Sequence, residues 1–327
     1  MALVRNNKRK LGNSGLEVTP LAFGGNVFGW TVEEARSLQL LDAFAAAGFD
    51  FIDTADVYSK WKPGNQGGES ETIIGKWMKQ RGNRANMVIA TKVGMELSPE
   101  KKGLGKDYIF RAVDDSLKRL QTNYIDLYFA HQDDPATPLA ETLEAFSQLI
   151  KSGKVRAIGA SNYTADRLAE ALKISGQNSW PRYEVLQPLY NLYDRAVYED
   201  QLEPLCLREN IGVITYFSLA SGFLSGKYRA KEDLPKHARG SRVEKYLNDR
   251  GLRILNALDE VARSRNATPS KVAIAWLMAR PSVTAPIASA TSLEQLRELV
   301  DATRLELSSE DIQKLQEASS ETRSASA

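Results

Sequence analysis

The stretch "FDFIDTADVY" at residues 49–58 begins as an apolar strand and ends with two carboxylates and a phenol. A strand that is apolar on both faces is typical of a parallel sheet covered by helices. The side chains of Asp53, Asp56 and Tyr58 follow at the carboxyl end of this strand. Because α/β folds gather their chemistry at the carboxyl ends of strands, the stretch predicts an inner strand that leads into a functional site.

Seven further apolar runs of the same kind alternate with stretches of helical periodicity. The strand candidates lie at residues 20–25, 87–92, 125–131, 155–161, 183–188, 212–218 and 283–289. The clearest helix candidates lie at residues 31–48, 138–153 and 267–280. This alternation predicts an α/β fold, a single (β/α)₈ TIM barrel. A doubly wound sheet is the alternative, but "FGGNVFGW" at residues 23–30 lacks the G-x-G-x-x-G turn which that fold requires.

The two ends of the chain add smaller elements to the predicted barrel. Two short strand-like runs flank Asn13, Ser14 and Gly15, which predicts an N-terminal β-hairpin. An amphipathic C-terminal helix precedes a Ser-rich end. We expect residues 1–320 to form one domain and residues 321–327 to be a disordered tail.

The composition argues against several classes of protein. The formal net charge is only +2, and Lys and Arg are interleaved with Asp and Glu, so a nucleic-acid groove is not expected. No run approaches the roughly 18 apolar residues of a transmembrane helix, and the N-terminus has no apolar signal segment. With two histidines and one cysteine, no metal site is expected. The single cysteine, Cys206, suits a reducing compartment and is expected to pack inside a helix, so we expect a cytoplasmic protein.

Three titratable side chains end consecutive predicted strands. Asp53 and Lys92 are 92 − 53 = 39 positions apart, and Lys92 and His131 are 131 − 92 = 39 apart. Each step is one strand–helix unit, so the three side chains should converge at one rim, with Tyr58 in the first loop. Each alone could be a helix cap, a strand end or a packed aromatic. Together, Lys92 should lower the pKa of Tyr58, and Asp53 should keep Lys92 charged. Asp56 has no partner on these strands and is expected to shape the loop.

These segments resemble those of the aldo-keto reductases. "FDFIDTADVY", "ATKVG" and "DLYFAH" are similar to the segments that carry the Asp, Tyr, Lys and His tetrad of that family. The likeness continues in order through "AIGASN", "QPLYN", "TYFSLASGFLSGKY" and "ASATSLEQLREL". The resemblance implies NAD(P)H-dependent reduction of an aldehyde or ketone, or alcohol oxidation in reverse. Tyr58 would be the general acid, Lys92 paired with Asp53 would lower its pKa, and His131 would bind the carbonyl.

The resemblance also assigns residues to the coenzyme. Those for the nicotinamide are Ser161, Asn162, Gln187 and Tyr216, the last stacking on the ring. Those for the pyrophosphate are Ser218, Leu219, Gly222 and Lys227. Those for the adenosine end are Ser289, Thr291, Gln295 and Glu298.

The adenosine segment departs from the family pattern that favours a 2′-phosphate. Members with that preference usually place Lys or Arg in the segment that matches residues 289–295, and this chain has neither there. Without a charge-assisted contact, the 2′-phosphate should add little affinity. The resemblance implies NADPH as the coenzyme, and the missing cation leads us to expect that NADH is accepted unusually well.

The substrate, a small carbonyl or alcohol, should bind between the loops that follow the strands. Trp30 and Trp61 are candidates for an apolar wall, and the loop at residues 58–71 is long for a simple turn. Residues 229–250 either fold over the bound coenzyme or form a solvated excursion, and His237 within them is expected to be a surface histidine.

Two other functions are compatible with this sequence. A Schiff-base aldolase also uses a lysine at the end of a barrel strand, although Asp53 should keep Lys92 protonated and so unreactive. A regulatory subunit that binds a coenzyme without turning over is the second, and the intact tetrad argues against it. The reductase is the interpretation that gives a role to all four residues of the tetrad.

Overall fold

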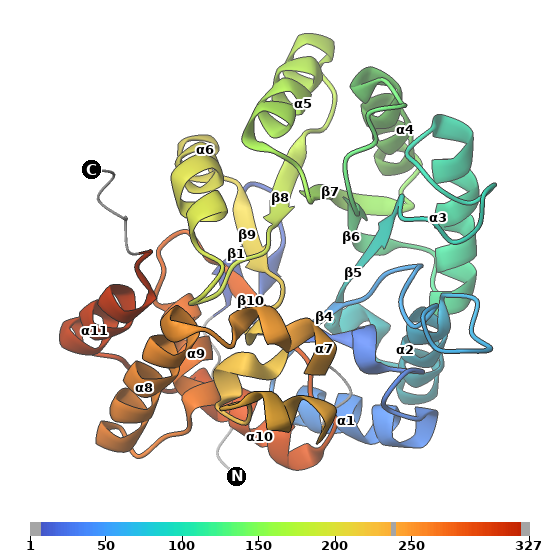
Figure 1. Ribbon diagram of the computed structural model, residues 1–327. Coiled ribbons are helices and arrows are strands. Elements are labelled where there is room, and N and C mark those ends of the chain that lie inside the picture. Colours follow the sequence, from blue (N-terminus) through green and yellow to red (C-terminus); the bar gives the residue numbers. More distant parts are fainter. Residues whose placement is uncertain (1–7, 237–239, 322–327) are drawn as a thin grey trace.

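Eight parallel strands form the closed barrel that the sequence predicts (Figure 1). The computed structural model describes residues 8–236 and 240–321. Around the barrel the strands follow the order β10-β3-β4-β5-β6-β7-β8-β9, so neighbours in the chain are neighbours in space. The strands are β3 (Ala22–Gly24), β4 (Phe51–Asp53), β5 (Val88–Val93), β6 (Ile125–Ala130), β7 (Val155–Ser161), β8 (Tyr183–Gln187), β9 (Gly212–Thr215) and β10 (Ala285–Ala288).

Helices surround the barrel on the outside (Figure 1). They are α1 (Glu34–Ala46), α2 (Glu69–Arg81), α3 (Lys106–Leu120), α4 (Leu139–Lys151), α5 (Ala165–Asn178), α6 (Glu203–Glu209), α8 (Asp249–Ser264), α9 (Pro269–Met278), α10 (Leu293–Ala302) and α11 (Ser309–Ser319). The predicted start of α9 is confirmed, because Thr268 accepts a hydrogen bond from the Lys271 amide and Pro269 takes the first position. Cys206 is buried in α6, as expected. Across the described ranges, no helix is both long enough and apolar enough to cross a membrane.

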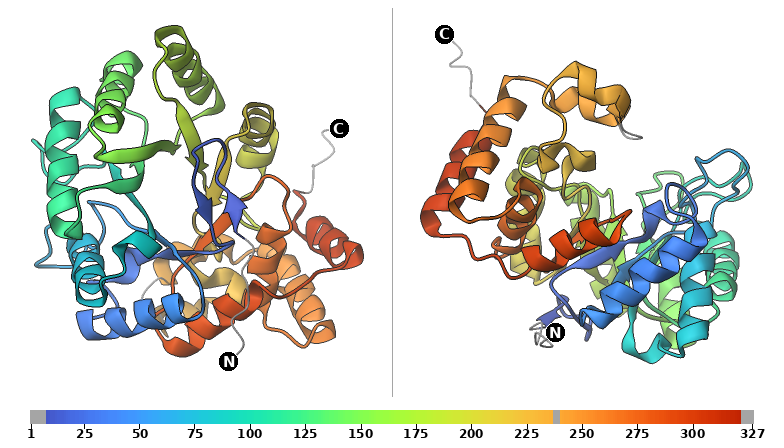
Figure 2. Two further views of the ribbon diagram at one scale, coloured as in Figure 1. Left: turned by 180° about the vertical axis from the view of Figure 1, so that it is seen from behind. Right: turned by 90° about the horizontal axis from the view of Figure 1, so that it is seen from below.

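An N-terminal hairpin closes the amino end of the barrel (Figure 2). β1 (Arg9–Lys10) and β2 (Glu17–Val18) pair antiparallel, which confirms the predicted hairpin. Leu11 and Val18 pack into the apolar cluster inside the barrel. Gly12 has φ +56°, and a Cβ added there would lie 2.5 Å from the Glu184 carbonyl, so the turn approaches β8 too closely for a side chain. With this end plugged, the carboxyl end is the side left for a site.

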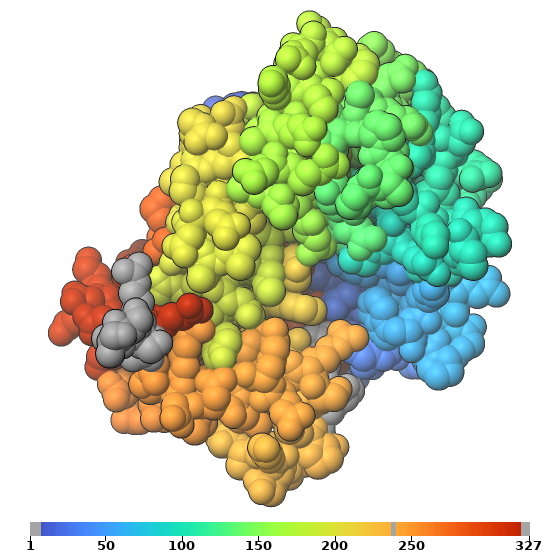
Figure 3. Space-filling model, turned by 45° about the horizontal axis from the view of Figure 1, so that its top comes forward, coloured from blue at the N-terminus to red at the C-terminus, as the bar shows by residue number. Residues whose placement is uncertain are grey.

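The chain between β9 and α8 departs most from the prediction. β9 ends at Thr215 rather than at residue 218, because Phe217 takes a left-handed φ of +54°. The short helices η4 (Ala220–Ser225), η5 (Lys231–Lys236), α7 (Gly240–Val243) and η6 (Glu244–Tyr246) follow. We call residues 231–236 and 240–246 the strap. In Figure 3 a hollow separates the orange strap from the blue segments near β3 and β4. His237 and all of the predicted tail except Glu321 lie outside the described residues.

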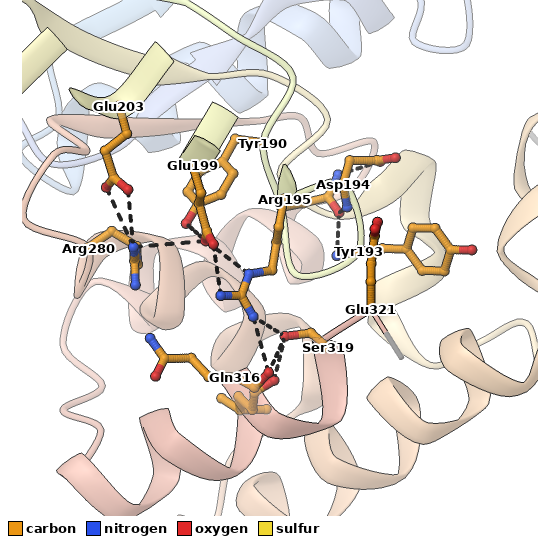
Figure 4. Close-up of polar contacts among 12 residues, drawn as sticks. Tyr190, Tyr193, Asp194, Arg195, Glu199, Glu203, Arg280, Gln316, Ser319 and Glu321 are labelled. Carbon is orange, nitrogen blue, oxygen red and sulfur yellow. Dashed lines mark hydrogen bonds and ion pairs between the residues drawn. The ribbon is translucent and has the colours of Figure 1, made fainter. Parts of the chain in front are cut away.

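A polar network ties α11 to the segment that follows β8 (Figure 4). The guanidinium of Arg195 binds both carboxylate oxygens of Glu199 at 2.9 Å. The same guanidinium donates to the Ser319 hydroxyl at 2.6 Å and to the Gln316 carbonyl at 3.1 Å. The predicted C-terminal helix therefore exists, and Arg195 joins it to the segment that follows β8.

Candidate active site

Asp53, Lys92 and Tyr58 form one hydrogen-bonded cluster at the carboxyl ends of β4 and β5. The Nζ atom of Lys92 lies 2.8 Å from both carboxylate oxygens of Asp53. It also donates to the Tyr58 hydroxyl at 2.9 Å and to the Thr54 carbonyl at 2.6 Å. The Tyr58 hydroxyl donates to Oδ2 of Asp53 at 3.2 Å. The structure thus brings together the residues that the strand-end spacing placed at one rim.

The acidity of Tyr58 differs from the expectation. Burial raises the pKa of Tyr58 well above its usual value, and the charge of Asp53 together with its hydrogen bond raises that pKa further. The expected lowering by Lys92 does not prevail, because the phenolate would lie in a desolvated site beside a carboxylate. The phenol is therefore held firmly in its protonated form.

Lys92 is shielded from the solvent and from any ligand. Its side chain is fully buried, and burial lowers the pKa of Lys92 while the charge and hydrogen bond of Asp53 oppose that effect. The expectation that Asp53 favours the charged form holds, but burial outweighs it. Because Nζ is surrounded by Asp53, Thr54 and Tyr58, this lysine acts on its neighbours rather than on a substrate.

His131 lies beside Tyr58 with its ring centroid 5.9 Å from that of the phenol. Burial, and secondarily the charge of Lys92, hold the pKa of His131 well below its usual value, so the imidazole is neutral. Its Nδ1 atom is buried and has no hydrogen-bond partner among the described residues, which leaves Nε2 as the nitrogen available to the cavity. A neutral imidazole at this place can donate a hydrogen bond to an oxygen.

A cavity of about 1080 Å³ opens above the cluster. The residues predicted for the coenzyme all line it, namely Ser161, Asn162, Gln187, Tyr216, Ser218, Leu219, Gly222, Lys227, Ser289, Thr291, Gln295 and Glu298. Asp53, Tyr58 and His131 line it as well, whereas Lys92 does not. The predicted catalytic and coenzyme residues therefore share one cavity.

One wall of the cavity is hydrogen-bonded to the catalytic cluster. The Tyr216 hydroxyl donates to Oδ1 of Asn162 at 2.8 Å, and the Ser161 hydroxyl donates to the Gln187 carbonyl at 2.9 Å. Asn162 has a left-handed φ of +56°, a strained conformation that gathers at functional sites. Nε2 of Gln187 donates to Oδ1 of Asp53 at 2.9 Å. The wall and the cluster are thus one network.

Comparison with known proteins agrees with this geometry. The model of the aldo/keto reductase family matches residues 20–320. The chain belongs to the aldo/keto reductase family. It is 34% identical over 305 residues to a probable voltage-gated potassium channel subunit beta of Oryza sativa subsp. japonica, with 90% of each chain covered. It is 33% identical over 313 residues to the uncharacterized oxidoreductase YrpG of Bacillus subtilis, with 93% of each covered. It is 30% identical over 323 residues to the aldo-keto reductase yakc [NADP(+)] of Schizosaccharomyces pombe, covering 95% of this chain and 90% of that one. Membership of this family indicates an oxidoreductase that acts on carbonyl compounds.

In this aldo/keto reductase, the loop after β9 has several residues in left-handed backbone conformations. Phe217, Ala220 and Ser221 all take left-handed φ values, of +54°, +47° and +59°. Gly222 follows with φ +98°, and a Cβ there would meet Nζ of Lys227 at 3.4 Å. Within this loop the amides of Ala220 and Gly222 donate to the carbonyls of Phe217 and Leu219, at 2.6 and 2.8 Å. The sequence resemblance indicated this loop, but only the structure reveals its strain.

The start of α10 is capped by its own side chains. The Ser292 hydroxyl accepts a hydrogen bond from the Gln295 amide at 3.2 Å. Oε1 of Gln295 accepts from the amide of Thr291 at 2.8 Å and from its hydroxyl at 3.0 Å. The amides of Thr291 and Gln295 are therefore already occupied, and residues 289–295 offer a 2′-phosphate no lysine or arginine.

The predicted aromatic wall is only partly correct. Trp61 lines the cavity and is 40% exposed, as expected for a residue at a mouth. Trp30 does not line the cavity, because it lies behind Trp61, with the two ring centroids 5.6 Å apart and edge-on. The guanidinium of Arg242 lies 5.8 Å from the Trp30 ring centroid and lines the cavity. Trp30 therefore lies between Trp61 and Arg242 of the strap.

Several lining residues were missed by sequence reasoning. Asn26 lies two residues after the end of β3 and accepts a hydrogen bond from the Ser289 hydroxyl at 2.6 Å, which leaves its amide nitrogen for the cavity. Its position after an apolar strand was a usable signal. Phe217 and Arg242 had no such signal, because a left-handed turn and the packing of the strap bring them to the cavity.

Asp56 lies outside the cavity in a buried charged cluster. Its carboxylate oxygens are buried and have no hydrogen-bond partner in the described part of the chain. Burial, followed by the charge of Glu71, raises the pKa of Asp56 well above its usual value. Glu71 itself is held by Arg119 and Thr91, each at 2.6 Å. The expectation of a loop residue is therefore incomplete, because Asp56 is an uncharged carboxyl in the protein interior. Within residues 8–236 and 240–321, no group of three His, Cys, Asp or Glu side chains could hold a metal ion.

Proposed function

We propose that this aldo/keto reductase uses NAD(P)H to reduce a small aldehyde or ketone to the alcohol, with Tyr58 as the general acid. The observation that carries the proposal is the contact of the Tyr58 hydroxyl with Lys92 at 2.9 Å and with Asp53 at 3.2 Å, at the edge of a large cavity. A phenol held between a cation and a carboxylate, and facing an open space, is suited to pass a proton to a ligand.

The residues around the cavity fit a nicotinamide coenzyme. Oε1 of Gln187 has no described donor and belongs to a side chain that lines the cavity, so it can accept the N–H of a carboxamide. Tyr216 offers a ring for stacking, and the loop that the resemblance assigns to the pyrophosphate lines the same cavity through Ser218, Leu219 and Gly222. When bound, the coenzyme supplies the hydride, and the chain supplies position and a proton.

Each member of the tetrad has a separate task in this proposal. The raised pKa of Tyr58 keeps its proton in place until negative charge develops on the carbonyl oxygen. Lys92 then stabilises the phenolate from 2.9 Å, and Asp53 holds the ammonium in position. Neutral His131 donates a hydrogen bond from Nε2 to the carbonyl oxygen.

The test is Tyr58→Phe, with Tyr124→Phe as the matched control. Tyr124 lies away from the cavity, with its ring between the guanidinium groups of Arg84 and Arg156. We expect Tyr58→Phe to lower kcat for carbonyl reduction by roughly 10²- to 10⁴-fold while the coenzyme Kd stays nearly unchanged. Tyr124→Phe should leave both unchanged. Wild-type kcat in Tyr58→Phe would reject the assignment of Tyr58.

For the coenzyme, we propose that NADPH is used and that NADH is accepted unusually well. The support is the start of α10, where Gln295 occupies the Thr291 amide and no lysine or arginine stands at residues 289–295. The relative in Schizosaccharomyces pombe carries NADP(+) in its name, which supports use of the phosphorylated coenzyme here. The ratio of kcat/KM for the two coenzymes tests the proposal, and a preference for NADPH of a thousandfold or more would reject it.

A second candidate is a coenzyme-binding regulatory subunit. It is favoured by the 34% identity to a protein that is named a probable channel subunit beta. Tight coenzyme binding without turnover, on a panel of aldehydes, ketones, sugars and alcohols, would support it over the reductase. The aldolase is disfavoured, because Lys92 does not line the cavity and its Nζ is enclosed by three oxygen-bearing partners.

A further inference from the structure

One hydrogen bond crosses the interior of the barrel. Gln187 ends β8 and Asp53 ends β4, and these strands are four positions apart in the ring of eight. Nε2 of Gln187 nevertheless donates to Oδ1 of Asp53 at 2.9 Å, and both side chains are buried. The bond therefore joins opposite walls, and it connects a cavity-lining amide with the carboxylate beneath Tyr58.

The negative charge of Asp53 is shared among three donors. Oδ1 receives Gln187 at 2.9 Å and Lys92 at 2.8 Å. Oδ2 receives Lys92 at 2.8 Å and the hydroxyl of Tyr58 at 3.2 Å. Because hydrogen bonds to a carboxylate disperse its charge, a change at Oδ1 alters how strongly Oδ2 holds the phenol proton.

We propose that Gln187 is a positioning residue that governs the proton transfer of Tyr58 through Asp53. The inference rests on the proposed function of Tyr58, and it adds that the amide which faces the coenzyme also tunes the acid. Gln187 has one amide group with two ends: Nε2 holds the carboxylate, and Oε1 faces the cavity. A ligand bound at Oε1 polarises the amide and strengthens the N–H bond to Asp53. A ligand in the carboxamide site thereby changes how strongly Asp53 holds the proton of Tyr58.

The direction of the effect follows from charge. Asp53 already raises the pKa of Tyr58 by its charge and its hydrogen bond. Loss of the Gln187 donor concentrates negative charge on Asp53, so the phenolate becomes less favourable still. Gln187→Met keeps the length of the side chain and removes the donor. Gln187→Glu, in its ionised form, adds a second negative charge and should act in the same direction more strongly.

Asn162 provides the matched control. It lines the same cavity and belongs to the same predicted carboxamide wall. Its amide donates to the His131 carbonyl at 2.8 Å and to the Ser161 hydroxyl at 3.2 Å, and no hydrogen bond joins it to Asp53 within the described residues. Asn162→Ala should therefore weaken coenzyme binding without acting on Tyr58.

The first experiment is a double-mutant cycle on the coenzyme-free protein. Gln187→Met and Asp53→Asn are made singly and together, and urea unfolding midpoints are compared. We expect the double variant to lose less than the sum of the two single losses, while Asn162→Ala and Asp53→Asn should be additive. Additivity in the Gln187 cycle would overturn the inference, because it would mean that the two side chains do not interact. If Gln187→Met does not fold, Gln187→Glu takes its place in the cycle.

The second experiment separates positioning from structural support. The pH profile of kcat for alcohol oxidation is measured at saturating coenzyme, where Tyr58 must accept a proton. Gln187→Met should move the limb that reports Tyr58 to higher pH by about half a unit to one unit, since the net contribution of one hydrogen bond is of that size. Asn162→Ala should raise the coenzyme KM and leave the limb in place. If the wild type is active and the Tyr58 limb of Gln187→Met lies at the same pH as in the wild type, this inference alone is overturned. If the wild type is inactive, the proposed function is overturned and the inference with it.

Discussion

Asp56→Asn is the substitution for which the structure gives the sharpest stability prediction. The carboxyl of Asp56 is 1% exposed, its oxygens have no hydrogen-bond partner in the described part of the chain, and its neighbour Glu71 already binds the nearby cation Arg119. Burial and the charge of Glu71 raise the pKa of Asp56 well above its usual value, so the folded protein keeps this proton to a higher pH than the unfolded chain does. Asparagine has the same shape and is uncharged at every pH.

The magnitude follows from proton linkage. In the unfolded chain, Asp56 loses its proton near pH 3.9, whereas in the folded protein it loses it at a much higher pH. The folded state thus binds one more proton than the unfolded state between these two values. The contribution of Asp56 to the free energy of unfolding is therefore complete below about pH 3.9. Above that pH it falls by about 1.4 kcal/mol for each pH unit, until the raised pKa is reached. Asp56→Asn removes this loss, so its advantage over the wild type should grow with each pH unit between about pH 3.9 and the raised pKa.

The assay is urea unfolding of both proteins at pH 5, 6, 7 and 8. The control is Asp200→Asn, since Asp200 is exposed and makes no ion pair with any described residue. The hydroxyl oxygens of Tyr108 and Tyr128 are buried without partners in the described ranges and belong to residues on which the charge of Asp56 acts, so the new amide has acceptors nearby. A stability difference between wild type and Asp56→Asn that stays constant over this pH range would refute the reasoning.

Three further substitutions test separate contacts. Gly75→Ala should destabilise by about 1–3 kcal/mol in urea unfolding, because the new Cβ would lie 2.2 Å from the Arg119 carbonyl; an unchanged midpoint would contradict this packing of α2 on α3. Arg195→Ala should lower the free energy of unfolding by about 2–3 kcal/mol, since Glu199 loses a partner that binds both of its oxygens and Ser319 loses a donor. Arg195→Lys should lower it less, and equal losses would show that the paired geometry is unimportant. Gln295→Arg should raise the NADPH to NADH ratio of kcat/KM about tenfold by adding a cation at the start of α10, and a ratio that does not move would mean that the 2′-phosphate binds elsewhere.

The barrel could be predicted because its signal is local and repeated. Each strand is an apolar run, each is followed by a helical period, and a constant step of 39 residues separates Asp53, Lys92 and His131. Residues that end strands could therefore be placed at one rim without knowledge of any contact. β9 shows the limit of this reasoning, since its apolar run continues past Thr215 while the left-handed turn at Phe217 ends the strand.

Properties that depend on how deeply a side chain is buried could not be predicted in the same way. The expected direction of the pKa shift of Tyr58 was wrong, because sequence gives the neighbours of a phenol but not the degree to which it is desolvated. Trp30 was placed in the wall for a similar reason, since it follows β3 as expected but lies behind Trp61. Arg242 comes from the strap, whose path has no periodic signal, so its place beside the cavity required the folded structure.

The contrast between Asp53 and Asp56 shows how the strand alternation divides the two carboxyls between different roles. On the adjacent strand β5, Thr91 points outward and binds Glu71 of α2, whereas Lys92 points inward and binds Asp53. Successive residues of a strand face opposite sides, so β5 can supply its one cation to only one of the two carboxyls. Asp53 lies on the side that receives the Lys92 ammonium and the Gln187 amide, so its negative charge is compensated and it can bond to the Tyr58 hydroxyl. Asp56 lies on the side where Glu71 has already taken the nearby guanidinium, so it keeps its proton. Exchanging the order of Thr91 and Lys92 would therefore remove the cation from the site and place it beside Asp56.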